Sequence, residues 1–171
     1  MQSAKRYTNT FTKRIDHEGG AKRGMAKLPS PSVCGTCHAV FDKGHWTAAR
    51  YVAPEMKFRE WSHAETVKCP ACRQKDAGIA GGYVQLSGAF LREHRDEIER
   101  LVENEVQRAQ ETNPLSIILA KKELEGTFTL ETSTEHLAER IGHALKNAYA
   151  GALDLDFSHE NKVVRVAWHR D

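Results

Sequence analysis

Apolar residues recur at helical spacing after Ser87, and they form the first regular pattern in the C-terminal half of the chain. Between Ser87 and about Glu111 they fall on one face of a helix, with Glu and Arg on the opposite face. Asn113 and Pro114 end this predicted helix, because proline cannot continue the helical hydrogen-bond pattern. The apolar face consists of Phe90, Leu91, Ile98, Leu101, Val102 and Val106.

A second helix is predicted between Thr132 and Gly151. Thr132 and Glu135 fit a capping box, and Gly151 provides the C-terminal stop. We expect Ile141 and Leu145 to be core residues, because they lie in the middle of its apolar face. That face consists of Leu137, Ile141, Ala144, Leu145, Ala148 and Tyr149.

Alternating apolar and polar positions predict two β-hairpins, one before and one after the second helix. A turn at Glu125-Gly126 joins the strands of the first hairpin. The four strands are expected at residues 117–123, 127–132, 153–157 and 164–168. The order αββαββ predicts an α+β domain with an antiparallel sheet and both helices on one face.

Glycine, proline and charge divide the chain into three expected segments. Residues 1–32 form a basic arm that is disordered when free, residues 33–76 a metal-binding module, and residues 77–171 the α+β domain. The first 75 residues carry fourteen Lys or Arg against six Asp or Glu, whereas the remainder carry eleven against seventeen. A basic first half is typical of a protein that contacts a polyanion.

Four cysteines form two matched pairs, Cys34-Gly-Thr-Cys37 and Cys69-Pro-Ala-Cys72, separated by 31 residues. Each pair places two thiolates on one tight turn, and four thiolates complete a tetrahedron around one structural Zn²⁺. We call this expected four-cysteine module the zinc ribbon. Zinc with four protein ligands has no open position for substrate water, so the metal is expected to stabilise the module and not to catalyse.

Other interpretations of these residues remain open. The pairs could be unrelated buried or redox-active thiols, because C-x2-C also occurs in thioredoxin-like sites. His38, His45 and His63 could replace a cysteine or build a second site. The sequence contains no Gly-rich phosphate loop, nucleophile elbow or HExxH pattern. We therefore predict that the protein is not an enzyme and has no small-molecule substrate.

Basic and aromatic residues of the arm and the zinc ribbon are the expected RNA contacts, because cations pair with phosphates and flat rings stack on unpaired bases. These residues are Lys5, Arg6, Lys13, Arg14, Lys22, Arg23, Lys27, Lys43, His45, Trp46, Arg50, Arg73 and Lys75. The alternative for the arm is a solvated tail without a partner. The alternative for Trp46, Phe58 and Trp61 is burial in the small core of the ribbon.

The sequence also bears on the cellular compartment. No stretch approaches the roughly 18 consecutive apolar residues of a membrane span. The first residues are polar and basic and lack the apolar core of a secretory signal. We therefore expect a soluble cytoplasmic protein without membrane contact, in which disulfides between the cysteines are unfavourable.

Four stretches resemble a small bacterial zinc-ribbon family: Cys34-Gly-Thr-Cys37-His38, Lys43-Gly44-His45-Trp46, Cys69-Pro-Ala-Cys72-Arg73, and the segment from Leu86 to Ile98. That family looks related to the nuclear export adaptor of the large ribosomal subunit, the nonsense-mediated decay protein three-like family. The resemblance runs from about Val33 to the end of the sequence. It implies binding to the large ribosomal subunit, with the four cysteines as zinc ligands. The adaptor has further C-x2-C pairs and domains, so an export role is not implied.

These observations lead to one hypothesis about function and two rivals. The hypothesis is a non-enzymatic ribosome-associated factor that binds ribosomal RNA of the large subunit. A role in translation regulation, as a stress or ribosome hibernation factor, would suit a small accessory protein of this type. A DNA-binding or transcription-associated zinc-ribbon protein would have the same electrostatic features, and a redox sensor would use the cysteines themselves.

Overall fold

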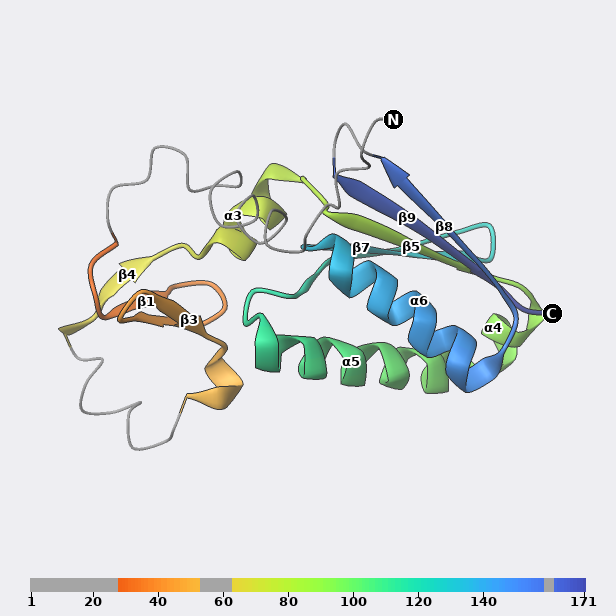
Figure 1. Ribbon diagram of the computed structural model, residues 1–171, viewed down its shortest axis with the longest axis horizontal. Coiled ribbons are helices and arrows are strands. Elements are labelled where there is room, and N and C mark those ends of the chain that lie inside the picture. Colours follow the sequence, from red (N-terminus) through yellow and green to blue (C-terminus); the bar gives the residue numbers. More distant parts are fainter. Residues whose placement is uncertain (1–27, 53–62, 159–161) are drawn as a thin grey trace, which may run out of the picture.

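The computed structural model describes residues 28–52, 63–158 and 162–171 and contains two β-sheets (Figure 1). A small sheet lies at one end of the molecule, and α3 (Pro70–Ala77) leads from it to a larger sheet covered by helices. This mixed α+β architecture, with its cluster of four cysteines, confirms the predicted fold class. Most of the predicted basic arm lies outside the described residues, as do Phe58 and Trp61.

The small sheet has four short strands in the order β3-β2-β1-β4. Strand β1 pairs antiparallel with β2 and parallel with β4, which follows it after the long spacer. Lys43 and Gly44 form the turn between β2 and β3 with φ angles of 48° and 86°. Two positive φ angles are typical of the tight hairpin turn that matches strand twist. The elements are β1 (Ser32–Cys34), β2 (Val40–Asp42), β3 (His45–Thr47), the 3₁₀ helix η1 (Ala49–Tyr51) and β4 (Glu65–Val67).

The larger sheet has five strands in the order β6-β7-β5-β9-β8. Neighbouring strands are antiparallel except for β5 and β9, which run parallel. Both predicted hairpins, β6-β7 and β8-β9, are confirmed, including the turn at Glu125-Gly126. The elements are β5 (Gly82–Ser87), α4 (Ala89–Glu93), α5 (Arg95–Thr112), β6 (Ile118–Leu124), β7 (Thr127–Thr132), α6 (Glu135–Tyr149), β8 (Ala152–Ser158) and β9 (Val163–His169).

The central strand β5 was missing from the predicted order αββαββ, so the sheet is mixed and not wholly antiparallel. Val84 and Leu86 of this strand are fully buried and alternate with more exposed residues, but the run is short and flanked by glycines. The first helix was expected to begin at Ser87, which instead ends β5. Gly88 adopts a φ of 108° and separates strand from helix. A break at His94 then divides the helical region into α4 and α5.

The cap of α6 also differs from the prediction. The side chain of Thr134 accepts a hydrogen bond from the backbone N–H of Leu137 at 3.2 Å and is the N-cap. The hydroxyl of Thr132 is buried and lies 3.2 Å from the carbonyl oxygen of Gly82 and 2.8 Å from that of Thr134. The predicted capping box of Thr132 with Glu135 is therefore wrong, because Thr132 remains the last residue of β7.

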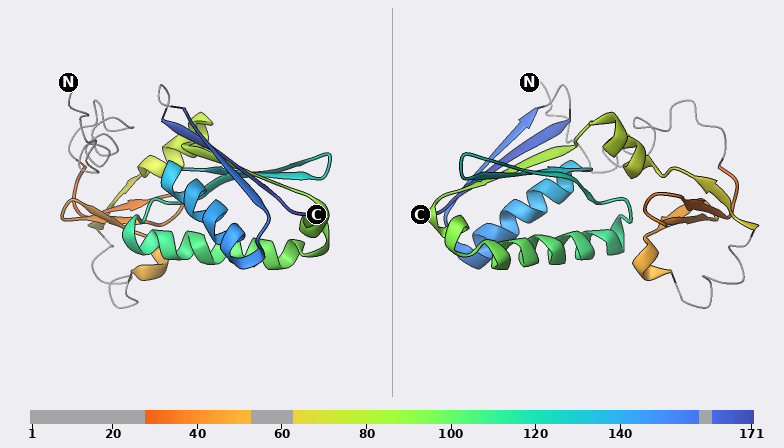
Figure 2. Two further views of the ribbon diagram at one scale, coloured as in Figure 1. Left: turned by 45° about the vertical axis from the view of Figure 1, so that its right-hand side comes forward. Right: turned by 180° about the vertical axis from the view of Figure 1, so that it is seen from behind.

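Helices α5 and α6 lie on the same face of the five-stranded sheet, as predicted (Figure 2). Ile141 and Leu145 of α6 are fully buried against the sheet, which confirms them as core residues. Within the described ranges, no helix has the length and apolar character needed to cross a membrane. The core between helices and sheet consists of Val84, Leu86, Leu91, Ile98, Val102, Val106, Ala109, Phe128, Leu130, Leu137, Ala138, Ile141, Leu145, Val164, Val166 and Trp168.

Gly142 allows α6 to lie close to the sheet, and Gly142→Ala is expected to destabilise the fold. A Cβ at this position would lie 2.5 Å from Val166 and 3.1 Å from Leu153. Overpacking of this kind costs about 1–3 kcal/mol, which exceeds the roughly 1 kcal/mol that alanine gains over glycine in a helix. Denaturant unfolding measures the difference. The exposed control Asn147→Ala should stay within about 0.5 kcal/mol of the native chain, and equal stability of both variants would contradict close packing.

Candidate metal centre

The pairing of β1 with β4 brings the two cysteine pairs together. Cys34 is the last residue of β1, and its register partner in β4 is Val67. The turn after β1 carries Cys37, while Cys69 lies two residues after the end of β4 and is the N-cap of α3. Cys72 lies in the first turn of α3. Residues distant in sequence thus meet because two parallel strands end at the same edge of the small sheet.

The four sulfur atoms lie within 4.8 Å of one another. Cys37 Sγ and Cys69 Sγ are separated by 3.6 Å. A tetrahedral zinc ion with Zn–S bonds of about 2.3 Å requires sulfur atoms about 3.8 Å apart. A disulfide requires about 2.05 Å, and all four cysteines are free thiols. The geometry is therefore that of a site that can hold a metal ion.

Burial and hydrogen bonds give the thiols different acidities. Burial disfavours the Cys34 thiolate, but hydrogen bonds from the backbone N–H groups of Cys37 and Cys69 outweigh it and lower the pKa of Cys34 to about 6. Burial raises the pKa of Cys72 to about 11, and it also raises the pKa of Cys69. Neighbouring thiolates add to both increases through like-charge repulsion. Burial and repulsion therefore oppose ionisation of all four thiols together, and a bound cation would stabilise the four thiolates.

The described histidines do not join this cluster. His38, His45 and His63 are exposed, and the group of potential ligands found in the described residues consists of the four cysteines. His38 adopts a φ of 59° directly after Cys37, so its backbone helps the chain to leave the first cysteine pair. A four-sulfur site is saturated for a tetrahedral ion and leaves no coordination position for a substrate.

The cysteine cluster packs against the larger domain through two residues that sequence reasoning missed. Leu115 and Ile117, in the loop between α5 and β6, are partly buried against the cysteines. Their apolar character was visible, but their proximity to the cysteines arises only from the tertiary fold. Hydrogen bonds also join the segment that carries the cysteines to the larger domain. Tyr51 Oη donates to the carbonyl oxygen of Gln107 at 3.0 Å, and Gln74 Nε2 donates to the carbonyl oxygen of Ser133 at 2.8 Å.

The expected RNA contacts that fall in the described residues occupy different environments. Lys43, His45 and Arg50 are exposed on the hairpin and on η1 of the small sheet. Lys75 is exposed on α3, whereas Arg73 on the same helix is partly buried. The remaining cations, Lys5, Arg6, Lys13, Arg14, Lys22, Arg23 and Lys27, lie outside the described residues.

Trp46 is partly buried and packs against the cysteine cluster and against Phe41, whose ring centroid is 5.3 Å away. Its ring nitrogen is buried and has no hydrogen-bond partner among the described residues. Trp46 therefore contributes to the small core, which was the alternative to a stacking role.

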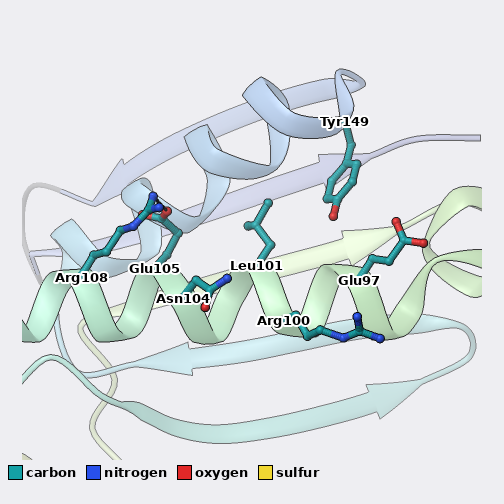
Figure 3. Close-up of a pocket in the computed structure, with 7 residues that line it drawn as sticks. All are labelled: Glu97, Arg100, Leu101, Asn104, Glu105, Arg108 and Tyr149. Carbon is teal, nitrogen blue, oxygen red and sulfur yellow. Dashed lines mark hydrogen bonds and ion pairs between the residues drawn. The ribbon is translucent and has the colours of Figure 1, made fainter. Parts of the chain in front are cut away.

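A groove lies between α5 and α6 (Figure 3). Its buried carboxylate, Glu105, accepts hydrogen bonds from Arg108 Nη1 at 2.9 Å and from Arg140 Nε at 2.6 Å. Leu101 and Tyr149 form an apolar part of the wall. Because the central carboxylate engages both guanidinium groups, these residues connect the two helices, and losing either arginine would leave Glu105 less compensated.

A chain of hydrogen bonds at the far end of the sheet contains the residue types of a catalytic triad. Ser87 Oγ lies 3.0 Å from His169 Nδ1, and His169 Nε2 lies 3.1 Å from Asp171. The interaction with His169 holds the pKa of the Asp171 carboxyl below its usual value. The N–H of Phe90 is engaged by the carbonyl of Arg170. The histidine and the aspartate are largely exposed, and the contact between Ser87 and His169 joins β5 to β9.

The geometry thus defines one candidate metal centre, positioned by β1, β4 and α3 and packed against the α5–β6 loop. Its donor set consists of sulfur atoms alone, which is typical of structural metal sites. A comparison of the chain with protein-family models, curated proteins and solved structures found no match.

Proposed function

We propose that the protein is a non-enzymatic, ribosome-associated factor that binds ribosomal RNA of the large subunit, with one structural Zn²⁺ on Cys34, Cys37, Cys69 and Cys72. The observation that carries this proposal is the four-sulfur cluster within 4.8 Å, embedded in the basic half of the chain. A saturated site of this kind stabilises a small module and leaves its surface available for contacts.

Zinc is the metal that best suits this donor set. Thiolates in a tetrahedral arrangement select zinc or iron over magnesium and calcium, which prefer oxygen ligands. Zinc has no redox chemistry, in keeping with a structural role. Metal analysis of the freshly purified chain tests the assignment. Finding iron and no zinc would contradict the assignment of zinc.

Polyanion binding is supported by the charge of the small module and the arm. Lys43, Arg50 and Lys75 are exposed, so their cations are accessible to phosphate groups. The acidic excess lies in residues 76–171, and a net negative charge disfavours contact with phosphate groups. Such a distribution orients the protein, because the basic end approaches RNA and the acidic end faces away from it.

The resemblance to the bacterial zinc-ribbon family favours the large ribosomal subunit over other polyanions. Translation regulation during stress, including ribosome hibernation, is the physiological role that we propose for such a factor in the cytoplasm. The alternative partner is duplex DNA. Sedimentation of a tagged chain through a sucrose gradient with ribosomal subunits, against retention on duplex DNA at matched salt, separates the two. Migration with the large subunit supports the proposal, and retention on DNA alone contradicts it.

Removing residues 1–27 is expected to weaken ribosome binding and to reduce its salt dependence. If Lys5, Arg6, Lys13, Arg14, Lys22 and Arg23 each neutralise a phosphate, the slope of log K against log salt should decrease by up to about 4. The change will be smaller where a cation stays in solvent. Binding measured at several salt concentrations gives the slope for the intact and shortened chains.

A paired substitution provides a milder version of the same test. Lys13→Ala combined with Arg14→Ala should weaken ribosome binding without changing metal content or thermal stability. Lys162→Ala combined with Arg165→Ala removes the same charge from the larger domain and serves as the control. An unchanged affinity and slope after loss of the arm would mean that the arm is a solvated tail.

A further inference from the structure

Strand β8 is an edge strand whose outer side is unpaired among the described residues. It pairs with β9 alone, in continuous antiparallel register from Ala152 to Ser158. Alternate backbone N–H and C=O groups of such a strand point away from the sheet and can accept another strand. The strand contains no proline, bulge or lysine, which are the usual obstacles to pairing at an edge.

The opposite edge of the sheet, β6, is protected by such features. Its register with β7 shifts between Ile118 and Ala120, which interrupts regular pairing. Lys121 and Lys122 lie on this strand and form ion pairs with Glu99 and Glu131. One edge of the sheet is thus blocked, and the other is open.

The two faces of β8 have different chemistry. Leu153, Leu155 and Phe157 face the helix side, where the first two pack against the core and Phe157 is still 45% exposed. Asp154 and Asp156 lie on the opposite face and are exposed. Neither aspartate forms an ion pair with a cation of the described residues.

The neighbouring cations do not neutralise these aspartates. Arg165 is the register partner of Asp156, but its guanidinium lies over the ring of Tyr83 on the far side of β9, 6.0 Å from the ring centroid. Asp154 is opposite Ala167. The open edge therefore presents two carboxylates on one face and an apolar stripe on the other.

This pattern disfavours pairing of β8 with β8 of a second copy. In an antiparallel pair centred on Leu155, each Asp154 would lie opposite Asp156 of the other chain. Like charges directly opposite each other destabilise a strand pair. An incoming strand that carries Lys or Arg opposite the aspartates and apolar residues opposite Leu155 and Phe157 would instead form favourable cross-strand pairs at these four positions.

We propose that β8 binds an extended protein segment in which basic and apolar residues alternate, and adds it to the sheet as a sixth strand. Backbone hydrogen bonds would supply the attachment, while Asp154, Asp156 and the apolar stripe would select the sequence. This interaction surface is independent of the proposed RNA contacts, because it lies on the acidic domain.

The test uses the isotope-labelled full chain and a capped heptapeptide in which Lys and Val alternate. We expect chemical-shift changes in β8, and slower exchange of alternate backbone amides between Ala152 and Ser158. Asp154→Lys combined with Asp156→Lys should weaken binding at least about tenfold, because two attractive cross-strand pairs become repulsive. The same variant should instead bind a heptapeptide in which Glu and Val alternate.

Two controls separate strand addition from general charge attraction. Asp96→Lys combined with Glu103→Lys makes the same change in net charge at exposed positions of α5, and should leave peptide binding unchanged. Two further peptides are N-methylated at odd or at even positions. Strand addition requires that only one of them loses binding, since alternate amides face the protein.

Several results would overturn the proposal. They are equal binding by both methylated peptides, equal losses in the two double variants, and absence of any protection in β8. Protection of the outward amides in the peptide-free monomer would show that the chain itself covers this edge. Concentration-dependent oligomers in sedimentation velocity, with the same protection, would assign the edge to a second copy.

Discussion

Cys72→Ser is expected to abolish stoichiometric metal binding and to unfold the small four-stranded sheet, while most of α5 and α6 stays folded. The core of that sheet is small and consists largely of the cysteines, with Ala39 and Ala71. A structural zinc ion contributes on the order of 10 kcal/mol or more to the folding of such a module. The larger domain has its own core and does not depend on the ion in the same way. Cys34→Ser should have the same effect.

The unfolding should nevertheless extend a short distance into the larger domain. Leu115 and Ile117 pack against the cysteines, so the loop between α5 and β6 should lose hydrogen-exchange protection together with the small sheet. Hydrogen exchange and circular dichroism measure these two effects, and elemental analysis measures the metal. Thr36→Ala, an exposed change within the first cysteine pair, is the control. Full metal content in Cys72→Ser would contradict the candidate centre, as would a metal-free native protein with reactive thiols.

Ile141→Ala is expected to lower the free energy of unfolding of the larger domain by about 2–5 kcal/mol. Ile141 is 0% exposed in the middle of α6, where the helix covers the five-stranded sheet. Removing three carbon atoms loses their transfer free energy and leaves a cavity that packed neighbours fill only in part. Denaturant unfolding followed by helix signal measures the change.

His143→Ala provides the matched control on the same helix. Its side chain is exposed, so its unfolding free energy should remain within about 0.5 kcal/mol of the native value. Metal content should stay unchanged in both variants, because neither residue contacts the cysteine cluster. If Ile141→Ala were as stable as His143→Ala, then α6 could not pack on the sheet as described.

The sequence by itself determined the elements whose signals are local. The hairpin turn at Glu125-Gly126, the end of α5 before Pro114 and the apolar face of α6 follow from residue type and spacing within one segment. The cysteine pairs are of the same kind, because C-x2-C spacing places two thiols on one turn wherever the segment lies. These features could be predicted, since backbone geometry and neighbouring side chains decide them.

Tertiary structure decided whatever depends on a partner distant in sequence. Strand β5 has glycines at both ends, and it becomes a strand because β7 and β9 pair with it on both sides. Thr132 is of a residue type that often caps helices, but it pairs as the last residue of β7. Thr134 is therefore the N-cap of α6.

The candidate metal centre shows the same division. Sequence spacing identified its four ligands, but the parallel pairing of β1 with β4 brings the two pairs together. The contact of Leu115 and Ile117 with the cysteines, and the open acidic edge at β8, likewise have no local signature. Long-range strand order and packing create them, because a periodic pattern specifies which face of a segment is apolar and not which segment will cover it.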